Sequence, residues 1–222
     1  MDTQALWLTL RLALSTTALL LVFALPLAWW IASGNGAVRA LMQAVVALPL
    51  MLPPTVLGFY LLVAMGPLTA PGRLIIRLFG HPLAFSFSGL VVGSVLYSLP
   101  FAVQPLVAGF RAVDSSLLEA AATLGASPVR TFWQVLLPLA KPSLITAAVL
   151  TFTHTVGEFG VVLMLGGNIP GATRTLSISL YDQVQDFNYA AANRTAAVLL
   201  AFSLLTLLAI YWRGAERRPL LG

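Results

Sequence analysis

Apolar residues fill five long stretches of the chain, and short polar segments separate these stretches. The apolar stretches cover residues 6–32, 41–65, 89–110, 143–165 and 196–212. A helix needs about 20 mostly apolar residues to cross a bilayer, and lipid offers backbone polar groups no partners outside the helix. We therefore predict an all-α integral membrane protein with about five transmembrane helices, built as a single domain over residues 6–212.

Composition supports a membrane setting. Hydrophobic residues make up 59% of the 222 residues and charged residues only 9%, whereas a soluble domain carries roughly 25% charged residues. Cysteine is absent, which excludes disulfides, thiolate metal sites and thiol catalysis. The net charge is +5, but the basic residues lie mostly in short loops and at the C-terminus. We therefore expect membrane lipid as a partner and no nucleic acid.

The basic residues also predict an orientation. Five spans place the N-terminus and the loops at residues 66–88 and 166–195 on one side of the membrane. The other side holds seven of the twelve basic residues, including the arginines of a tail at residues 213–222. Because Arg and Lys accumulate in cytoplasmic segments, we predict an outside N-terminus and a cytoplasmic C-terminus.

Prolines interrupt the second stretch at Pro53 and Pro54, followed by Thr55. Proline removes a backbone donor and bends a helix, and free carbonyl groups at membrane depth are tolerated only inside protein or along a wet cavity. Two interpretations remain open for Pro53, Pro54 and Thr55. They form either a packing irregularity or part of a gate or transport pathway.

Two ionisable residues, His154 and Glu158, lie within the fourth stretch. Residues four apart share a helix face, and an ionisable group at membrane depth usually points into the bundle or a cavity. One interpretation is a structural hydrogen bond between His154 and Glu158, or across a dimer. The other is that the pair forms part of a gate.

The segment at residues 114–138, between the third and fourth apolar stretches, predicts two short helices joined by a sharp turn. Asp114 or Ser115 is a good N-cap, and helix-forming residues follow as far as Thr123. Gly125 can end the first helix in a left-handed conformation. Serine and proline at Ser127-Pro128 then begin the second helix. Such a hairpin, placed between two spans on the cytoplasmic side, is typical of a docking element.

The same segment resembles the EAA motif of ABC importer permeases. Glu119-Ala120-Ala121, then Gly125, then Val135-Leu136-Leu137-Pro138 match its fixed positions. The resemblance implies a type I ABC importer permease fold in which this segment sits in a cleft of an ATPase subunit. It further implies that Ala120 and Ala121 allow tight packing, that Gly125 makes the turn, and that Glu119 pairs with polar groups of the ATPase.

Nearly the whole chain resembles the molybdate permease family. The resemblance rests on four segments, at residues 52–60, 97–101, 157–160 and 167–175. It implies an inner-membrane importer of molybdate with two copies of the permease, two ABC ATPase subunits and a periplasmic molybdate-binding protein. ATP and Mg would bind the ATPase, and this chain would hold no cofactor. Sulfate, thiosulfate and tungstate remain alternative cargoes, because sulfate permeases share the patterns at residues 157–160 and 168–171.

Functions of other classes are less well supported by the residues. An intramembrane enzyme needs facing catalytic groups, and only one acidic residue is embedded. An ATP-independent channel or carrier would leave the docking hairpin without a purpose. A phosphate-binding loop ends in Gly-Lys-Ser/Thr, and the only lysine, Lys141, precedes a proline. We therefore expect a translocation subunit that is not itself an enzyme.

Hydroxyl groups that could meet a passing anion, or could instead bond within their own helix, are those of Thr55, Ser94, Ser98, Thr153 and Thr155.

Overall fold

The computed structural model describes residues 2–215 and is built from helices. In chain order these are α1 (Thr3–Ala32), α2 (Ala37–Met51), α3 (Pro54–Met65), α4 (Ala70–Phe79), α5 (Phe87–Arg111), α6 (Ser115–Thr123), α7 (Pro128–Thr131), the π-helix η1 (Phe132–Leu136), α8 (Leu137–Leu139), α9 (Lys141–Gly157), α10 (Gly160–Gly166), α11 (Leu176–Gln185) and α12 (Tyr189–Ala215). No strand occurs among these residues.

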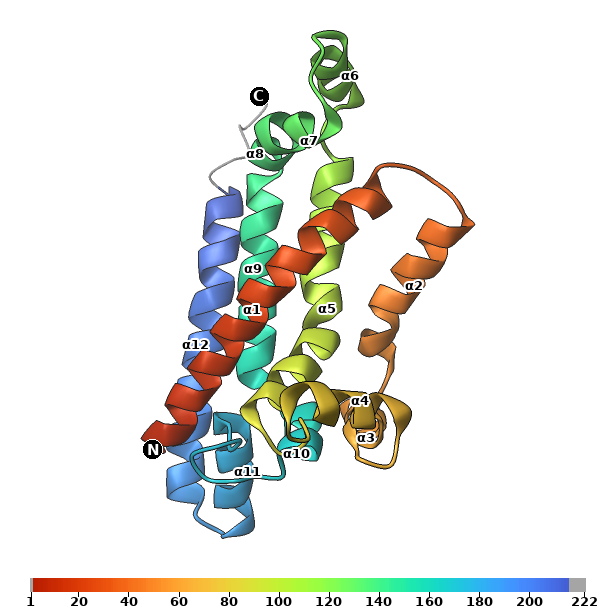
Figure 1. The fold of residues 1–222 in the computed structure, drawn as a ribbon. Coiled ribbons are helices and arrows are strands. Elements are labelled where there is room, and N and C mark those ends of the chain that lie inside the picture. The colour runs from red at the N-terminus through yellow and green to blue at the C-terminus, as the bar shows by residue number, and fades with distance from the viewer. Residues whose placement is uncertain (1, 216–222) are drawn as a thin grey trace.

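The bundle is organised around α1, α5 and α9, which pack against one another, with α2 against α5 and α12 against α9. Figure 1 shows α6, α7 and α8 at one end of the bundle, where α12 also ends. The start of α1 lies at the opposite end with α3, α4, α10 and α11. The loops at residues 66–88 and 166–195 therefore share the end where α1 begins, as predicted.

Helix length and hydropathy identify spans that could cross a membrane. Over the described residues, α1, α5 and the Tyr189–Ala209 part of α12 qualify alone. Two bent pairs raise the number to five: α2 with α3, bent by 110°, and residues 128–139 with α9, bent by 75°. Many large apolar side chains on the outside of the bundle are exposed, including Val22 at 66% and Leu200 at 71%, as expected for surfaces that face lipid.

Two of the predicted spans are not continuous helices. The stretch at residues 41–65 breaks at Leu52 and Pro53, which both have extended backbone, since proline disfavours the α conformation in the residue before it. The stretch at residues 143–165 breaks at Glu158 and Phe159. The helix that contains the last predicted span, residues 196–212, is longer than that span, because α12 begins at Tyr189 and runs to Ala215. The predicted basic tail therefore begins inside this helix, and its residues 216–222 lie outside the described part of the chain.

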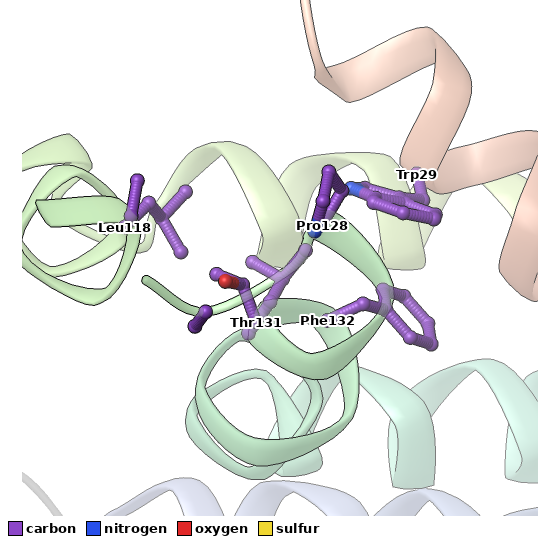
Figure 2. Close-up of a pocket in the computed structure, with 8 residues that line it drawn as sticks. Trp29, Leu118, Pro128, Thr131 and Phe132 are labelled. Atoms are coloured by element: carbon purple, nitrogen blue, oxygen red, sulfur yellow. The ribbon is translucent and has the colours of Figure 1, made fainter. Parts of the chain in front are cut away.

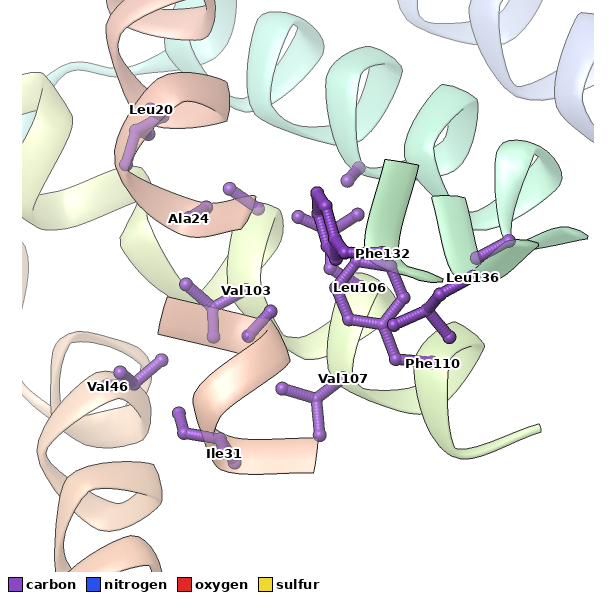
Figure 3. Close-up of a cluster of buried hydrophobic side chains, with 14 residues drawn as sticks. Leu20, Ala24, Ile31, Val46, Val103, Leu106, Val107, Phe110, Phe132 and Leu136 are labelled. Atoms are coloured by element: carbon purple, nitrogen blue, oxygen red, sulfur yellow. The ribbon is translucent and has the colours of Figure 1, made fainter. Parts of the chain in front are cut away.

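The hydrophobic core has two parts, one toward each end of the bundle. The cluster nearer to α6 joins α1, α2, α5 and η1, and Figure 3 shows Phe132 and Leu136 of η1 meeting Leu106 and Phe110 of α5. The second cluster joins α1, α5, α10 and α11 around Leu12, Leu90 and Leu165. Each of these three leucines is 0% exposed. The segment α6 contributes no buried residue, so it projects from the bundle.

Candidate functional site

The docking hairpin, residues 114–138, folds through local interactions. The backbone N–H of Ser116 donates to the Asp114 carboxylate at 2.9 Å, caps α6 and lowers the pKa of that carboxyl. At the other end of α6, Ala126 N–H donates to Ala121 C=O and Gly125 N–H to Ala122 C=O. This is a Schellman arrangement, and it holds Gly125 at φ +79°. The predicted helix, turn and caps are thus present.

The face of the hairpin that carries Glu119 and Ala120 is open to solvent. Glu119 and Ala120 are exposed and Ala121 is partly buried. The Glu119 carboxylate takes part in no salt bridge or hydrogen bond within residues 2–215, although its backbone C=O accepts from Thr123 Oγ1 at 2.9 Å. Sequence reasoning missed Leu124, which is 88% exposed at the tip of the hairpin. An apolar residue directly before a left-handed glycine was the available signal.

A small apolar pocket separates α6 from the bundle. It has a volume of about 210 Å³ and is lined by Trp29, Leu118, Ala122, Ala126, Pro128, Thr131, Phe132 and Leu136. Figure 2 shows Leu118 of α6 on one side and Trp29, Pro128 and Phe132 on the other. We call this space the hairpin pocket.

A second site lies at membrane depth, where the two broken spans meet. A pocket of about 500 Å³ is lined by Pro54, Thr55, Tyr97, Thr153, His154, Gly157, Glu158, Phe159 and Gly160. The structure thus brings together four of the five residues predicted for a gate or pathway. The fifth, Pro53, is the N-cap of α3 and does not line this membrane-depth pocket. Irregular backbone at this depth is tolerated where it borders such a cavity.

His154 does not pair with Glu158. Its Nδ1 lies 2.9 Å from the Ser98 hydroxyl oxygen, and its ring stacks on Phe101 with centroids 4.0 Å apart. The interpretation of a His154–Glu158 hydrogen bond is therefore wrong within this chain. The physical reason is that α9 ends at Gly157, and Glu158 has extended backbone at φ −65° and ψ 132°. The one-turn spacing that would align the two side chains is lost.

The Glu158 carboxyl group is buried without a partner. The residue is 3% exposed, and neither carboxyl oxygen makes a hydrogen bond within the described residues. The Ser94 hydroxyl is close to it but is also without a hydrogen bond. The backbone is held instead, because Ser177 of α11 donates its hydroxyl to the Glu158 C=O. A buried polar group without a partner is costly, so this carboxyl group is a candidate for function.

The other candidate hydroxyl groups divide into two kinds. Thr153 and Thr155 bond the backbone C=O groups of Val149 and Thr151, each at 2.9 Å, as the structural interpretation predicted. Ser98 is occupied by His154 and by Thr155, whose Oγ1 lies 3.1 Å away. Thr55 lines the membrane-depth pocket and can meet a ligand there, whereas Ser94 is fully buried beside Glu158 and does not line this pocket.

The loop between α10 and α11 is held in a fixed shape. Asn168, with φ +59°, donates its amide to both carboxylate oxygens of Asp182 at 3.0 and 2.9 Å. Arg174 Nε donates to the Asn168 side-chain oxygen at 2.7 Å. Thr173 Oγ1 donates to Gly166 C=O at 2.6 Å and is fully buried. These bonds explain the polar residues of the 167–175 segment as structural, at the end of the bundle opposite the hairpin.

No group of three or more His, Cys, Asp or Glu residues that could hold a metal ion occurs within residues 2–215. The hairpin offers a capped, exposed surface, and the membrane-depth pocket offers hydroxyl, imidazole and carboxyl groups beside a helix break.

Comparison with protein families matches residues 8–215 to the model described as binding-protein-dependent transport system inner membrane component. The molybdenum transport system permease protein ModB of Azotobacter vinelandii is 54% identical over 210 residues, covering 95% of this chain and 93% of that protein. The ModB protein of Escherichia coli strain K12 is 35% identical and covers 97% and 96%. A probable sulfate transport system permease protein, cysT of Nephroselmis olivacea, is 34% identical and covers 96% and 75%.

Solved structures support the fold. A chain of the MetNI methionine ABC transporter in an inward-facing conformation aligns with a TM-score of 0.75 at 20% identity, covering 99% of this chain and 97% of that chain. A chain of a bacterial ABC transporter that imports alginate aligns with a TM-score of 0.67 at 16% identity, covering 100% and 82%. At these identities the likeness concerns the fold, and it agrees with the predicted type I importer architecture.

Proposed function

The chain belongs to the family of inner membrane components of binding-protein-dependent transport systems, and from this premise we propose that it is the permease subunit of an ABC importer for molybdate. The observation that supports molybdate as the cargo is the 54% identity to a molybdenum transport permease over nearly the whole length of both chains. Sulfate is the second candidate, because a probable sulfate permease is 34% identical. Thiosulfate and tungstate share the oxyanion chemistry and are competitors to be tested.

Energy for transport comes, in this proposal, from a separate ATPase that binds ATP and Mg. The docking hairpin supports this, since its outer surface combines the unpaired Glu119 carboxylate with small residues at Ala120 and Ala121. Small side chains let a partner approach closely, and Glu119 can receive hydrogen bonds from it. Two ATPase subunits would serve two copies of the permease, and their closure would move both hairpins.

The membrane-depth pocket is proposed as part of the pathway or gate. It lies where α3 begins at Pro54, and the N-terminus of a helix carries partial positive charge that favours an anion. Thr55 can donate a hydrogen bond to an oxyanion in transit, and Glu158 would limit how tightly the anion is held. Weak binding suits a permease, because conduction requires release as well as entry.

The remaining partners and the orientation follow from the same proposal. The hairpin lies on the cytoplasmic side of the inner membrane, the N-terminus lies outside, and the end with α4 and α11 receives a periplasmic molybdate-binding protein. The arrangement in Figure 1 supports this assignment, because α4 and α11 are at the opposite end of the bundle from α6. The binding protein would deliver molybdate only to the outward-open state.

The proposal is tested by uptake of labelled molybdate in a strain that lacks its own permease and carries this one. We expect uptake that excess sulfate barely reduces and that Gly125→Asp abolishes. Strong suppression by sulfate would reassign the cargo to sulfate. Uptake that persists with Gly125→Asp would contradict the coupling to an ATPase.

A further inference from the structure

Phe132 is a residue of the docking hairpin that packs into the hydrophobic core of the bundle. It is 5% exposed and begins η1, directly after α7. Its ring lies against Trp29 of α1 with centroids 4.8 Å apart, and edge-on to Phe110 of α5 at 5.9 Å. One side chain of the hairpin thus contacts two helices of the central bundle, with Trp29 shown beside Phe132 in Figure 2 and Phe110 in Figure 3.

The hairpin has little other attachment near α6. None of the residues of α6 is buried, and only Leu118 of this helix packs against the hydrophobic cluster that contains Phe132. The hairpin pocket of about 210 Å³ lies between them, as Figure 2 shows. Interiors are close-packed and transmit displacement, whereas an empty space does not. Besides the short connection from α5 through residues 112–114, a movement of α6 reaches α1 and α5 through the packed side chains beside the pocket, among them Leu118 and Phe132.

The backbone at Phe132 is also unusual. Residues 132–136 form a π-helix, and the Leu137 N–H donates to the Phe132 C=O. Single π-turns are rare and frequently mark functional positions. Here the π-turn places Phe132 beneath Trp29 while the next aromatic residue, Trp133, is 59% exposed.

We propose that Phe132, packed against Trp29, is a positioning residue that transmits movement of the docking hairpin to the transmembrane bundle. The proposal rests on the proposed function, because it assumes that an ATPase moves α6. Phe132 is buried and does not line the membrane-depth pocket. Its role is to keep hydrolysis and transport in step.

The test uses the complete transporter, with the ATPase and the binding protein, reconstituted in liposomes. ATP hydrolysis and molybdate transport are measured on the same samples, and ATPase retention is measured by co-purification. For Phe132→Leu we expect normal ATPase retention, hydrolysis close to wild type, and a rise of about three- to tenfold in ATP consumed per molybdate, the range that loss of an aromatic pair implies.

If the Phe132→Leu variant fails to assemble, variants of Trp29, whose ring contacts Phe132, still test the inference. Trp29 is only partly buried, so its replacement is better tolerated. Trp29→Leu should raise the same ratio, Trp29→Phe should preserve it, and the double variant with Phe132→Leu should be no worse than either single variant. Phe152→Leu is the matched control, since it removes one ring of the Phe152–Phe202 pair between α9 and α12, whose centroids are 5.8 Å apart.

Three results would overturn the inference. Hydrolysis and transport could fall in parallel for Phe132→Leu and Trp29→Leu, which is the signature of simple destabilisation. The ratio could stay at the wild-type value in both variants. Phe152→Leu could raise it equally. Transport of molybdate by the wild-type permease in liposomes that lack the ATPase subunit would instead contradict the proposed function. Failure of the Phe132 inference and failure of the proposed function are therefore distinguishable.

Discussion

Gly160 at the start of α10 lies directly against Pro54 at the start of α3. A Cβ atom placed on Gly160 would come within 2.7 Å of the Pro54 Cβ and 3.4 Å of the Thr55 backbone nitrogen. Both helices begin at a break in a predicted span, so this contact joins the two breaks at the edge of the membrane-depth pocket. The absence of a side chain at Gly160 is what lets them meet.

Gly160→Ala should therefore separate α3 from α10. Because the nearest atoms belong to a proline ring and to backbone, they cannot simply rotate away, and overpacking of this kind costs about 1–3 kcal/mol. We expect a lower melting temperature for the purified protein. Gly157→Ala is the matched control, since a Cβ there would meet nothing within 4 Å. Equal melting temperatures for the two variants would contradict the contact.

The Glu158→Gln variant should lose transport activity without losing stability. Among the described residues, the carboxyl oxygens make no hydrogen bond that the substitution would break, and the backbone stays anchored by Ser177. We expect an unchanged or higher melting temperature together with uptake reduced by about tenfold, or about 1.4 kcal/mol in the barrier.

Ser177→Ala provides the opposite control for Glu158. It leaves the carboxyl group in place but removes the donor to the Glu158 C=O, so it should lower stability. Normal uptake by Glu158→Gln would exclude a gate or pathway role for this residue.

Thr9 links the first helix to α11 and should be sensitive to loss of its hydroxyl. Its Oγ1 accepts from the Leu176 N–H at 2.9 Å and donates to the Ala5 C=O at 2.7 Å, and the residue is 1% exposed. Thr9→Val would leave the Leu176 N–H unsatisfied at a cost of about 1–3 kcal/mol. Thermal unfolding should show this loss, and Thr9→Ser should retain the bond.

Thr16 is the matched control on the same helix. It is 0% exposed, and its hydroxyl has no partner among the described residues. Thr16→Val should be neutral or stabilising, because it replaces an unsatisfied hydroxyl with an apolar group of the same shape. A similar loss of stability in Thr9→Val and Thr16→Val would show that the bond to Leu176 contributes nothing.

The effect of a substitution at Gly125 should depend on how well the new residue tolerates a left-handed backbone conformation. Its φ of +79° disfavours residues with a Cβ, although the space around it is open, and the left-handed conformation costs roughly 1–2 kcal/mol for an ordinary residue. Asparagine tolerates this region better than valine. We expect Gly125→Asn to keep more ATPase co-purification than Gly125→Val. The reverse order would mean that the turn geometry does not govern docking.

The features that the sequence predicted correctly depend on interactions between neighbouring residues. The apolar stretches predicted membrane helices because a bilayer demands length and hydrophobicity, which are properties of contiguous residues. The caps at Asp114 and the turn at Gly125 were predictable because each depends on bonds within a few residues. The break at Pro53 and Pro54 was anticipated as an irregularity, since proline lacks a backbone donor.

The arrangement of the membrane-depth pocket needed the tertiary structure. No proline marks the break at Glu158. There the hydroxyl of Ser177 in α11, 19 residues away, donates a hydrogen bond to the Glu158 backbone C=O. The partner of His154 is Ser98, 56 residues away, so the spacing of His154 and Glu158 predicted the wrong pair. Phe132 likewise meets Trp29 only because α1 crosses the start of η1. The sequence alone determined which segments enter the membrane and where the docking hairpin turns, because those follow from neighbouring residues. Packing between distant helices decided which buried groups find partners, and within residues 2–215 it left the Glu158 carboxyl group without one.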